Sequence, residues 1–182
     1  MSHGAVQPAT VAPPAVVNLA NALTLLRLLL VPVFVVLVLH GDGQETGWRI
    51  AAWAAFAVAT ITDRIDGEVA RRRGCVTDVG KIIDPIADKA LIGAALVSLS
   101  LIGDLAWWVT IVILVREVGV TLLRFVVIRH GVMPASRGGK AKTLAQAVAI
   151  GLYLLPLPSV LMPVAAAIMG AAVVLTVVTG LD

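Results

Sequence analysis

Long apolar segments, separated by short polar loops, dominate this sequence and limit the folds that are open to it. Of its 182 residues, 59% are hydrophobic and only 14% are charged, whereas a soluble domain carries about a quarter charged residues. A helix needs about 20 apolar residues to cross a bilayer, so a chain of this length has room for about six spans. We therefore predict an all-α polytopic membrane protein with six transmembrane helices.

The apolar segments separate one membrane domain from one tail. Residues 1–16 are small and polar, contain several prolines and show no periodicity, which predicts a disordered N-terminal tail. Residues 17–182 then form the membrane domain. Its helices are expected at residues 17–40, 48–70, 80–102, 105–129 and 143–155, with a last helix that ends near residue 179.

The loops differ in charge, and this difference predicts the orientation of the chain. The loops after the second and fourth predicted helices hold most of the lysines and arginines, whereas the opposite loops hold Asp42, Glu45 and Asp104. Because basic loops stay in the cytoplasm, both termini are expected there. These loops also account for the net charge of +3. No basic stripe alternates with aromatic residues, so nucleic acid is not an expected partner.

Four aspartates lie at the expected cytoplasmic ends of the second and third helices. Asp63 and Asp66 are three residues apart, and Asp84 and Asp88 are four apart, so each pair shares one helical face. Carboxylates beside lipid need a partner or a cation, and ligands that are all oxygen suit Mg²⁺, Mn²⁺ or Ca²⁺ rather than zinc. Two such cations can clamp a phosphoryl group. The spacing therefore predicts a two-metal phosphotransfer site.

The aspartates belong to a longer pattern, which reads Asp63-x₂-Asp66-Gly67-x₂-Ala70-Arg71-x₈-Gly80-x₃-Asp84-x₃-Asp88. This pattern resembles the signature of the CDP-alcohol phosphatidyltransferases at every position. The resemblance implies six transmembrane helices, a homodimer in the bacterial inner membrane and an active site toward the cytoplasm. It also implies transfer of a phosphoalcohol from a CDP-linked lipid to an alcohol, with release of CMP.

The resemblance assigns roles to individual residues. Asp63, Asp66 and Asp84 are implied ligands of two Mg²⁺ or Mn²⁺ ions, and Asp88 is an implied ligand and the general base on the acceptor hydroxyl. The positions implied to bind the donor, CDP-diacylglycerol, are Asn21, Thr24, Arg27, Gly67, Arg71 and Thr77. Two alternatives stay open: Thr77 is equally suited to cap a helix, and the polar residues of the first helix suit an interfacial helix face.

The flanking motifs are similar to those of bacterial phosphatidylglycerophosphate synthases. They are the stretch from Asn18 to Arg27, the motif Arg116-Glu117-Val-Gly119 and the loop at residues 134–143. The implied acceptor is sn-glycerol 3-phosphate, an anion, so a basic pocket is expected beside the aspartates. The candidates for the acceptor phosphate are Arg116, Arg137, Lys140 and Lys142. For Arg116, a pair with Glu117 or with an aspartate is the alternative.

Other functions fit parts of the same pattern. An enzyme of the same family with inositol phosphate, serine or phosphatidylglycerol as acceptor would carry the same aspartates. A cation transporter would place its carboxylates near the middle of the bilayer, whereas these lie at one edge beside Gly67 and Arg71. Paired surface charges, with Arg71 and its neighbours as partners, are the remaining alternative for a single aspartate. The enzyme accounts for all four aspartates together.

Overall fold

The described part of the chain folds into six α-helices. The computed structural model describes the backbone of residues 19–73, 78–127 and 137–181, and the side chains of residues 24–63, 86–123 and 141–180. Within these ranges there are two short 3-10 helices, η1 (His40–Gly43) and η3 (Ser159–Leu161), and no β-strand. The α-helices are α1 (Leu19–Leu39), α2 (Thr46–Arg73), α3 (Asp78–Leu101), α4 (Trp107–Val127), α5 (Arg137–Leu154) and α6 (Met162–Leu181).

These helices confirm the all-α prediction and the six expected segments. The largest difference concerns α5, which begins at Arg137 rather than near Thr143. The prediction followed the apolar run, but backbone hydrogen bonds do not require apolar side chains, so a helix can continue beyond the part that suits lipid. The basic residues before Thr143 therefore lie on the same helix as the apolar segment that follows.

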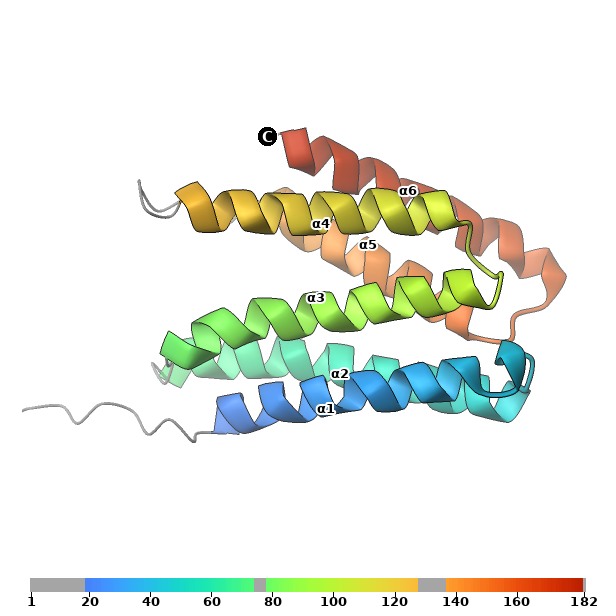
Figure 1. The fold of residues 1–182 in the computed structure, drawn as a ribbon, viewed down its shortest axis with the longest axis horizontal. Coiled ribbons are helices and arrows are strands. Elements are labelled where there is room, and N and C mark those ends of the chain that lie inside the picture. The colour runs from blue at the N-terminus through green and yellow to red at the C-terminus, as the bar shows by residue number, and fades with distance from the viewer. Residues whose placement is uncertain (1–18, 74–77, 128–136, 182) are drawn as a thin grey trace, which may run out of the picture.

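Successive helices run in opposite directions and form one bundle (Figure 1). Helix α1 packs against both α2 and α3, while α5 packs most extensively against α6. Helix α4 contacts α3 and α6, and α5 also contacts α2 and α3. The start of α1 and the end of α6 lie at the same end of the bundle, which we call the terminal end (Figure 1). The opposite end, with η1, η3 and the α3–α4 turn, is called the turn end.

The core consists of apolar side chains from all six helices. Phe34 of α1 and Phe56 of α2 are both buried, and their ring centroids lie 5.9 Å apart in a tilted arrangement. Leu96 and Leu99 of α3 are fully buried in the same core. Aromatic pairs in this geometry add to the stabilisation that burial provides. The core therefore holds α1, α2 and α3 in a defined arrangement.

The outer surface of the bundle is also apolar. Large side chains such as Leu29, Val115, Leu123 and Val174 are exposed, which an aqueous surface would disfavour. Two segments, Thr24–Gly43 and Ser159–Gly180, are long and apolar enough to cross a membrane. Most of each segment faces away from the bundle, as expected for helices that contact lipid.

Arg49 ties together several elements at the turn end. Its guanidinium donates to the carbonyl oxygens of Gly43 (3.1 Å), Leu154 (3.3 Å) and Tyr153, and it forms an ion pair with Asp104 at 2.6 Å. The last carbonyls of a helix have no partner within the helix, so Arg49 caps α5 from a distant part of the chain. This contact closes the end of the bundle that lies opposite the aspartates.

Candidate active site

The parts of α2 and α3 that carry the aspartates lie at the terminal end of the bundle (Figure 1). Asp63 and Asp66 lie on α2, and Asp84 and Asp88 lie on α3, so each pair occupies one continuous helix, as the spacing predicts. Asp63 and Asp88 are partly buried, and their charges repel each other between the two helices. The side chains of Asp66 and Asp84 lie outside the described residues.

Arg27 joins α1 to this site. Its Nη1 atom lies 2.6 Å from Oδ1 of Asp63, and its side chain is only 4% exposed. Thr24, one turn earlier, is also buried, whereas Leu25 and Leu26 between them are exposed. Thr24 and Arg27 therefore point into the bundle, so at these two positions the polar side of α1 is not an interfacial face.

Arg27 also acts on the aspartate of the third helix. Its positive charge attracts Asp88 while it pairs with Asp63. Because α1 packs against both α2 and α3, one arginine acts on carboxylates of two different helices. Arg27 thus offsets part of the repulsion between Asp63 and Asp88.

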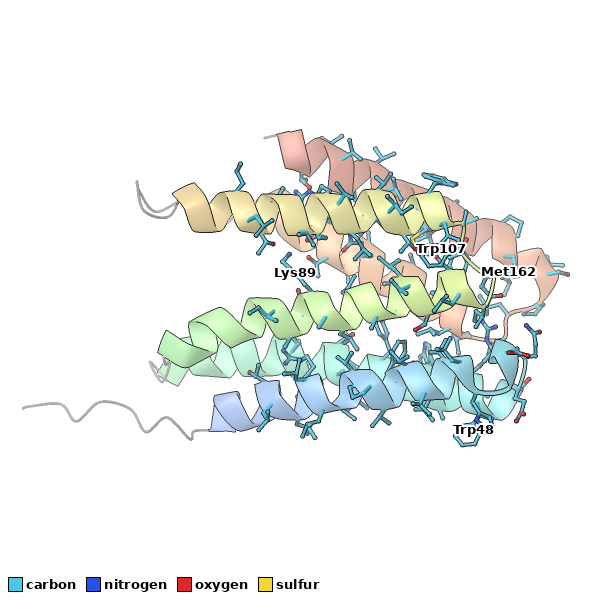
Figure 2. All side chains as sticks on the ribbon, in the orientation of Figure 1. Trp48, Lys89, Trp107 and Met162 are labelled. Carbon is cyan, nitrogen blue, oxygen red and sulfur yellow. The ribbon has the colours of Figure 1, made fainter. Side chains whose placement is uncertain are left out.

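A second set of charged residues lies near the aspartates, and Glu117 of α4 is at its centre. Glu117 Oε2 accepts from Lys89 Nζ at 2.7 Å, and Oε1 accepts from Lys142 Nζ and from Arg116 Nη1 at 3.3 Å. We call these four residues the Glu117 cluster. Lys89 points into the space between α3 and α4, on the side of the bundle away from Trp48, Trp107 and Met162 (Figure 2).

Arg116 connects the Glu117 cluster to α6. Its Nη2 atom donates to the carbonyl oxygen of Thr179 at 2.6 Å and to the hydroxyl of Thr179 at 3.0 Å. Gly180 permits this approach, because a Cβ atom at that position would lie only 2.8 Å from Nε of Arg116. The cluster therefore joins α3, α4, α5 and α6 at one level of the bundle.

The Glu117 cluster and the aspartates are electrostatically connected. Lys89 directly follows Asp88 on α3, and the charges of Lys89 and Glu117 both act on Asp88. A carboxylate suited to accept a proton is thus followed on α3 by Lys89, one of three cations in the cluster that are suited to hold an anion. This arrangement fits an acceptor that carries both a hydroxyl and a negatively charged group.

The structure brings together a part of the residues predicted from the sequence. Thr24, Arg27, Asp63 and Asp88 lie around the junction of the first three helices, and Arg116 and Lys142 meet at Glu117. The predicted residues whose side chains lie outside the described part are Asn21, Gly67, Arg71, Thr77, Arg137 and Lys140, besides the two aspartates named above.

Two members of the Glu117 cluster were missed or underestimated. Lys89 was not among the predicted site residues, although its position next to Asp88 was a signal for it. Glu117 was considered only as a partner for Arg116. That pair exists, but Glu117 also binds two lysines from other helices, which no local sequence pattern could indicate.

The described donor atoms are compatible with the predicted cations. Among the described side chains, no three His, Cys, Asp or Glu residues lie close enough to hold a metal ion. Two of the four predicted ligands are outside that set. The two that are described, Asp63 and Asp88, offer only oxygen atoms and repel each other, and hard divalent cations favour such ligands.

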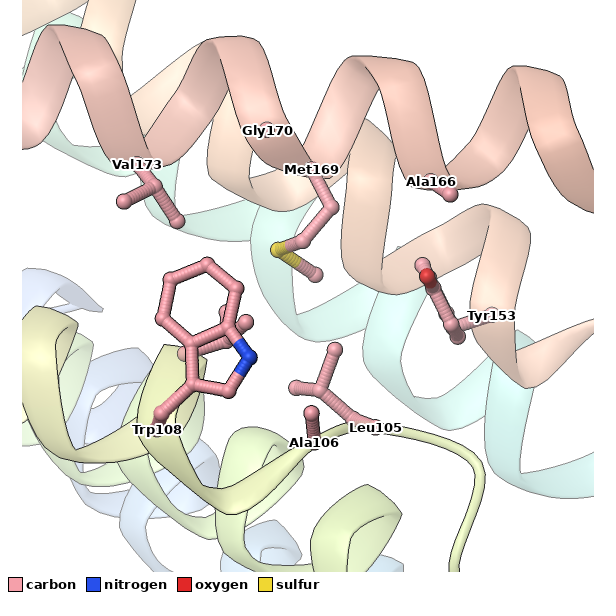
Figure 3. A pocket seen from close by; sticks show the side chains of 9 residues that line it. Leu105, Ala106, Trp108, Tyr153, Ala166, Met169, Gly170 and Val173 are labelled. Carbon is pink, nitrogen blue, oxygen red and sulfur yellow. The ribbon is translucent and has the colours of Figure 1, made fainter.

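A cavity of about 190 Å³ lies at the turn end, between α4, α5 and α6 (Figure 3). Its lining includes Trp108, Tyr153, Met169 and Val173 and is largely apolar. Because the aspartates and the Glu117 cluster lie toward the terminal end, this cavity is not part of the candidate active site.

Comparison with known proteins gives consistent matches along nearly the whole chain. The family model of the CDP-alcohol phosphatidyltransferases matches residues 17–178. A protein of Mycobacterium tuberculosis described as "Probable phosphatidylglycerophosphate synthase" is 58% identical over 167 residues, which cover 92% of this chain and 80% of the relative.

Two more distant relatives match with similar coverage. The CDP-diacylglycerol–glycerol-3-phosphate 3-phosphatidyltransferase of Bacillus subtilis is 39% identical over 176 residues, with 90% of this chain and 91% of the relative covered. The cardiolipin synthase (CMP-forming) of Streptomyces coelicolor is 34% identical over 155 residues, with 82% and 71% covered. The chain therefore belongs to the CDP-alcohol phosphatidyltransferase family.

Proposed function

We propose that this chain transfers the phosphatidyl group of CDP-diacylglycerol to sn-glycerol 3-phosphate, giving phosphatidylglycerophosphate and CMP. The observation that carries this proposal is that Asp88, whose charge is repelled by Asp63, directly precedes Lys89, one of the three cations of the Glu117 cluster. The relatives from M. tuberculosis and B. subtilis, which bear names for this reaction, support the choice of acceptor.

In the proposed reaction, the residues of this chain bind both substrates and move one proton. The carboxylate of Asp88 accepts the proton of the acceptor hydroxyl, and the resulting oxygen attacks the phosphorus that bears the diacylglycerol. The bond from that phosphorus to the CMP oxygen breaks, and CMP leaves. Arg27, at the junction of α1 and α2, is placed to hold a phosphate of the donor. The other proposed donor-binding residues are Asn21, Thr24, Gly67, Arg71 and Thr77.

Two Mg²⁺ or Mn²⁺ ions are the proposed cofactors, with Asp63, Asp66, Asp84 and Asp88 as their ligands. When bound, these ions would neutralise negative charge on the pyrophosphate of the donor. The repulsion between Asp63 and Asp88 supports this assignment, because carboxylates that repel each other near lipid are stabilised by a cation.

We propose that all six helices cross the inner membrane of a bacterium, with both termini and the active site toward the cytoplasm. The exposed apolar side chains on the outside of the bundle support the membrane location, and the basic loops support the orientation. The family resemblance supports a homodimer. Cross-linking in membranes at low protein density would test the homodimer, which predicts a doubled mass.

An acceptor panel tests the proposed reaction. Purified protein in detergent micelles is supplied with CDP-diacylglycerol and with sn-glycerol 3-phosphate, inositol phosphate, serine or phosphatidylglycerol, and CMP is measured. We expect CMP release with sn-glycerol 3-phosphate and with none of the other three acceptors. EDTA should abolish this release, and added Mg²⁺ or Mn²⁺ should restore it. Release with phosphatidylglycerol instead would favour the activity named for the S. coelicolor relative. CMP release that is unchanged in EDTA would contradict the proposed cofactors.

A further inference from the structure

Two members of the Glu117 cluster, Lys89 and Glu117, have no assigned role in the proposed reaction. Glu117 is the only carboxylate in its cluster, and its side chain is 10% exposed. A buried carboxylate is strongly destabilising without partners, and each of its oxygens accepts from a lysine on another helix. The residue therefore fixes the positions of cations that would otherwise repel one another.

The net charge of the cluster complements the charge of one kind of ligand. Three cations and one carboxylate, +3 and −1, leave a net charge of +2. A phosphomonoester carries nearly two negative charges at neutral pH, because its second ionisation lies at about pH 6. A phosphodiester carries only one, and an amino acid such as serine has no net charge. The cluster therefore matches a phosphomonoester better than either alternative.

Among the three cations, Lys89 is the one most available to a ligand. Its side chain is 33% exposed, compared with 15% for Arg116 and 8% for Lys142. Arg116 already donates to Glu117 and to Thr179. An ammonium group has three N–H donors, and Lys89 gives one of them to Glu117. The other two have no partner among the described residues.

We propose that Lys89 is a specificity-determining residue that binds the phosphate of the acceptor, and that Glu117 is a positioning residue that holds Lys89 and Lys142 for this contact. The inference deepens the proposed function and rests on it, since it requires a phosphomonoester acceptor. Lys89 directly follows Asp88, so the same turn of α3 would bind the phosphate of the acceptor and accept the proton of its hydroxyl.

The first test separates binding from chemistry. We expect Lys89→Gln to raise the KM for sn-glycerol 3-phosphate about tenfold or more, as the loss of a charge-assisted hydrogen bond implies. The kcat and the KM for CDP-diacylglycerol should change little, and Lys89→Arg should restore most of the loss. Thr121→Val is the matched control, because Thr121 bonds to the backbone of Glu117 at 2.6 Å and carries no charge. A fall in kcat with an unchanged KM would mean that Lys89 acts only through Asp88, and would overturn the proposal.

The second test concerns the positioning role of Glu117. We expect Glu117→Gln to raise the same KM, and we expect Lys89→Gln to add little further loss in that background, because Glu117 acts through Lys89 and Lys142. If the Gln variant does not fold, Glu117→Asp takes its place, since it keeps the charge and shortens the reach. If the double variant shows the product of the two single increases in KM, Glu117 does not position the lysines. A fall in KM for Glu117→Gln would lead to the same conclusion.

A binding measurement separates this inference from the proposed reaction. Inorganic phosphate, titrated without donor or acceptor, should raise the Tm of the wild-type protein and of Thr121→Val, and should have a much smaller effect on Lys89→Gln. A response that is equal in all three proteins would overturn the phosphate site even if the enzyme makes phosphatidylglycerophosphate. If instead no acceptor phosphate supports CMP release but inorganic phosphate still binds through Lys89, the proposed reaction fails and the anion site stands.

Discussion

The guanidinium of Arg27 lies 2.6 Å from the carboxylate of Asp63, and the pair joins the first helix to the second. Asp63 is a proposed metal ligand, so the arginine and a bound divalent cation would act on the same charge. Arg27 also attracts Asp88 on α3. The stability of the site therefore depends on the positive charge, from Arg27 or from a metal ion, that offsets the charges of the aspartates.

Replacing Arg27 with Gln should make the stability of the protein respond more strongly to divalent cations. Without the guanidinium, Asp63 and Asp88 repel each other with less compensation. In EDTA we expect the free energy of unfolding to fall by about 1–2 kcal/mol, since Asp63 is partly exposed. Added Mg²⁺ should then raise the Tm of Arg27→Gln more than that of the wild type, as measured by thermal unfolding in detergent.

The matched control for this prediction is Arg49→Gln, which removes an arginine that also pairs with an aspartate at 2.6 Å. Its Tm should fall, but its response to Mg²⁺ should equal that of the wild type, because Arg49 lies at the turn end. A Mg²⁺ response that is the same in Arg27→Gln and in the wild type would contradict the link between Arg27 and the metal site.

Asp88→Asn should abolish turnover without unfolding the protein. The loss of a general base lowers kcat by about 100- to 10,000-fold. In EDTA the Tm should rise slightly, because the substitution removes a charge that Asp63 repels. Asp104→Asn, a carboxylate at the other end of the bundle, should keep its kcat. Substantial turnover by folded Asp88→Asn would exclude the residue as the base.

Arg49→Gln should destabilise the turn end and leave catalysis intact. The substitution removes donors to three carbonyl oxygens and an ion pair, so we expect a loss of about 2–4 kcal/mol. Asp104→Asn removes only the ion pair and should cost less. Urea or thermal unfolding measures the loss, while the KM for both substrates should stay unchanged. Equal losses for the two variants would mean that the contacts of Arg49 with the backbone contribute nothing.

Two glycines of α6 should respond in opposite ways to the same substitution. Gly170 lines the apolar cavity, and no atom lies within 4 Å of a Cβ added there, so Gly170→Ala should stabilise the helix by about 0.5–1 kcal/mol. A Cβ at Gly180 would lie 2.8 Å from Nε of Arg116. Gly180→Ala should therefore lower the Tm and raise the KM for sn-glycerol 3-phosphate. A stabilising Gly180→Ala would show that Arg116 moves aside without cost.

The helices were predictable because each property that defines them is local. The apolar runs and polar loops locate all six helices, and the spacing of Asp63 with Asp66 and of Asp84 with Asp88 correctly places each pair on one helix. The polar residues that recur along the first helix indicated that they share one face of it. The structure adds that this face is buried at Thr24 and Arg27.

The contacts between helices were not predictable in the same way, because they depend on which helices become neighbours. Arg49 donates to carbonyl oxygens of α5, and every residue has a carbonyl, so no sequence pattern marks the acceptor. Glu117 binds Lys89 from α3 and Lys142 from α5. An ionisable residue within a helix of this kind indicates a function, but several lysines and arginines were equally possible partners before the packing was known.

The packing of α1 against both α2 and α3 has a consequence for how the protein is made. Arg27 precedes Asp63 and Asp88 in the sequence, so it is synthesised before either carboxylate. Its ion pair with Asp63 can form once α2 is made, whereas its attraction for Asp88 has to wait for α3. The order of synthesis thus makes a cation available before the carboxylates that it stabilises.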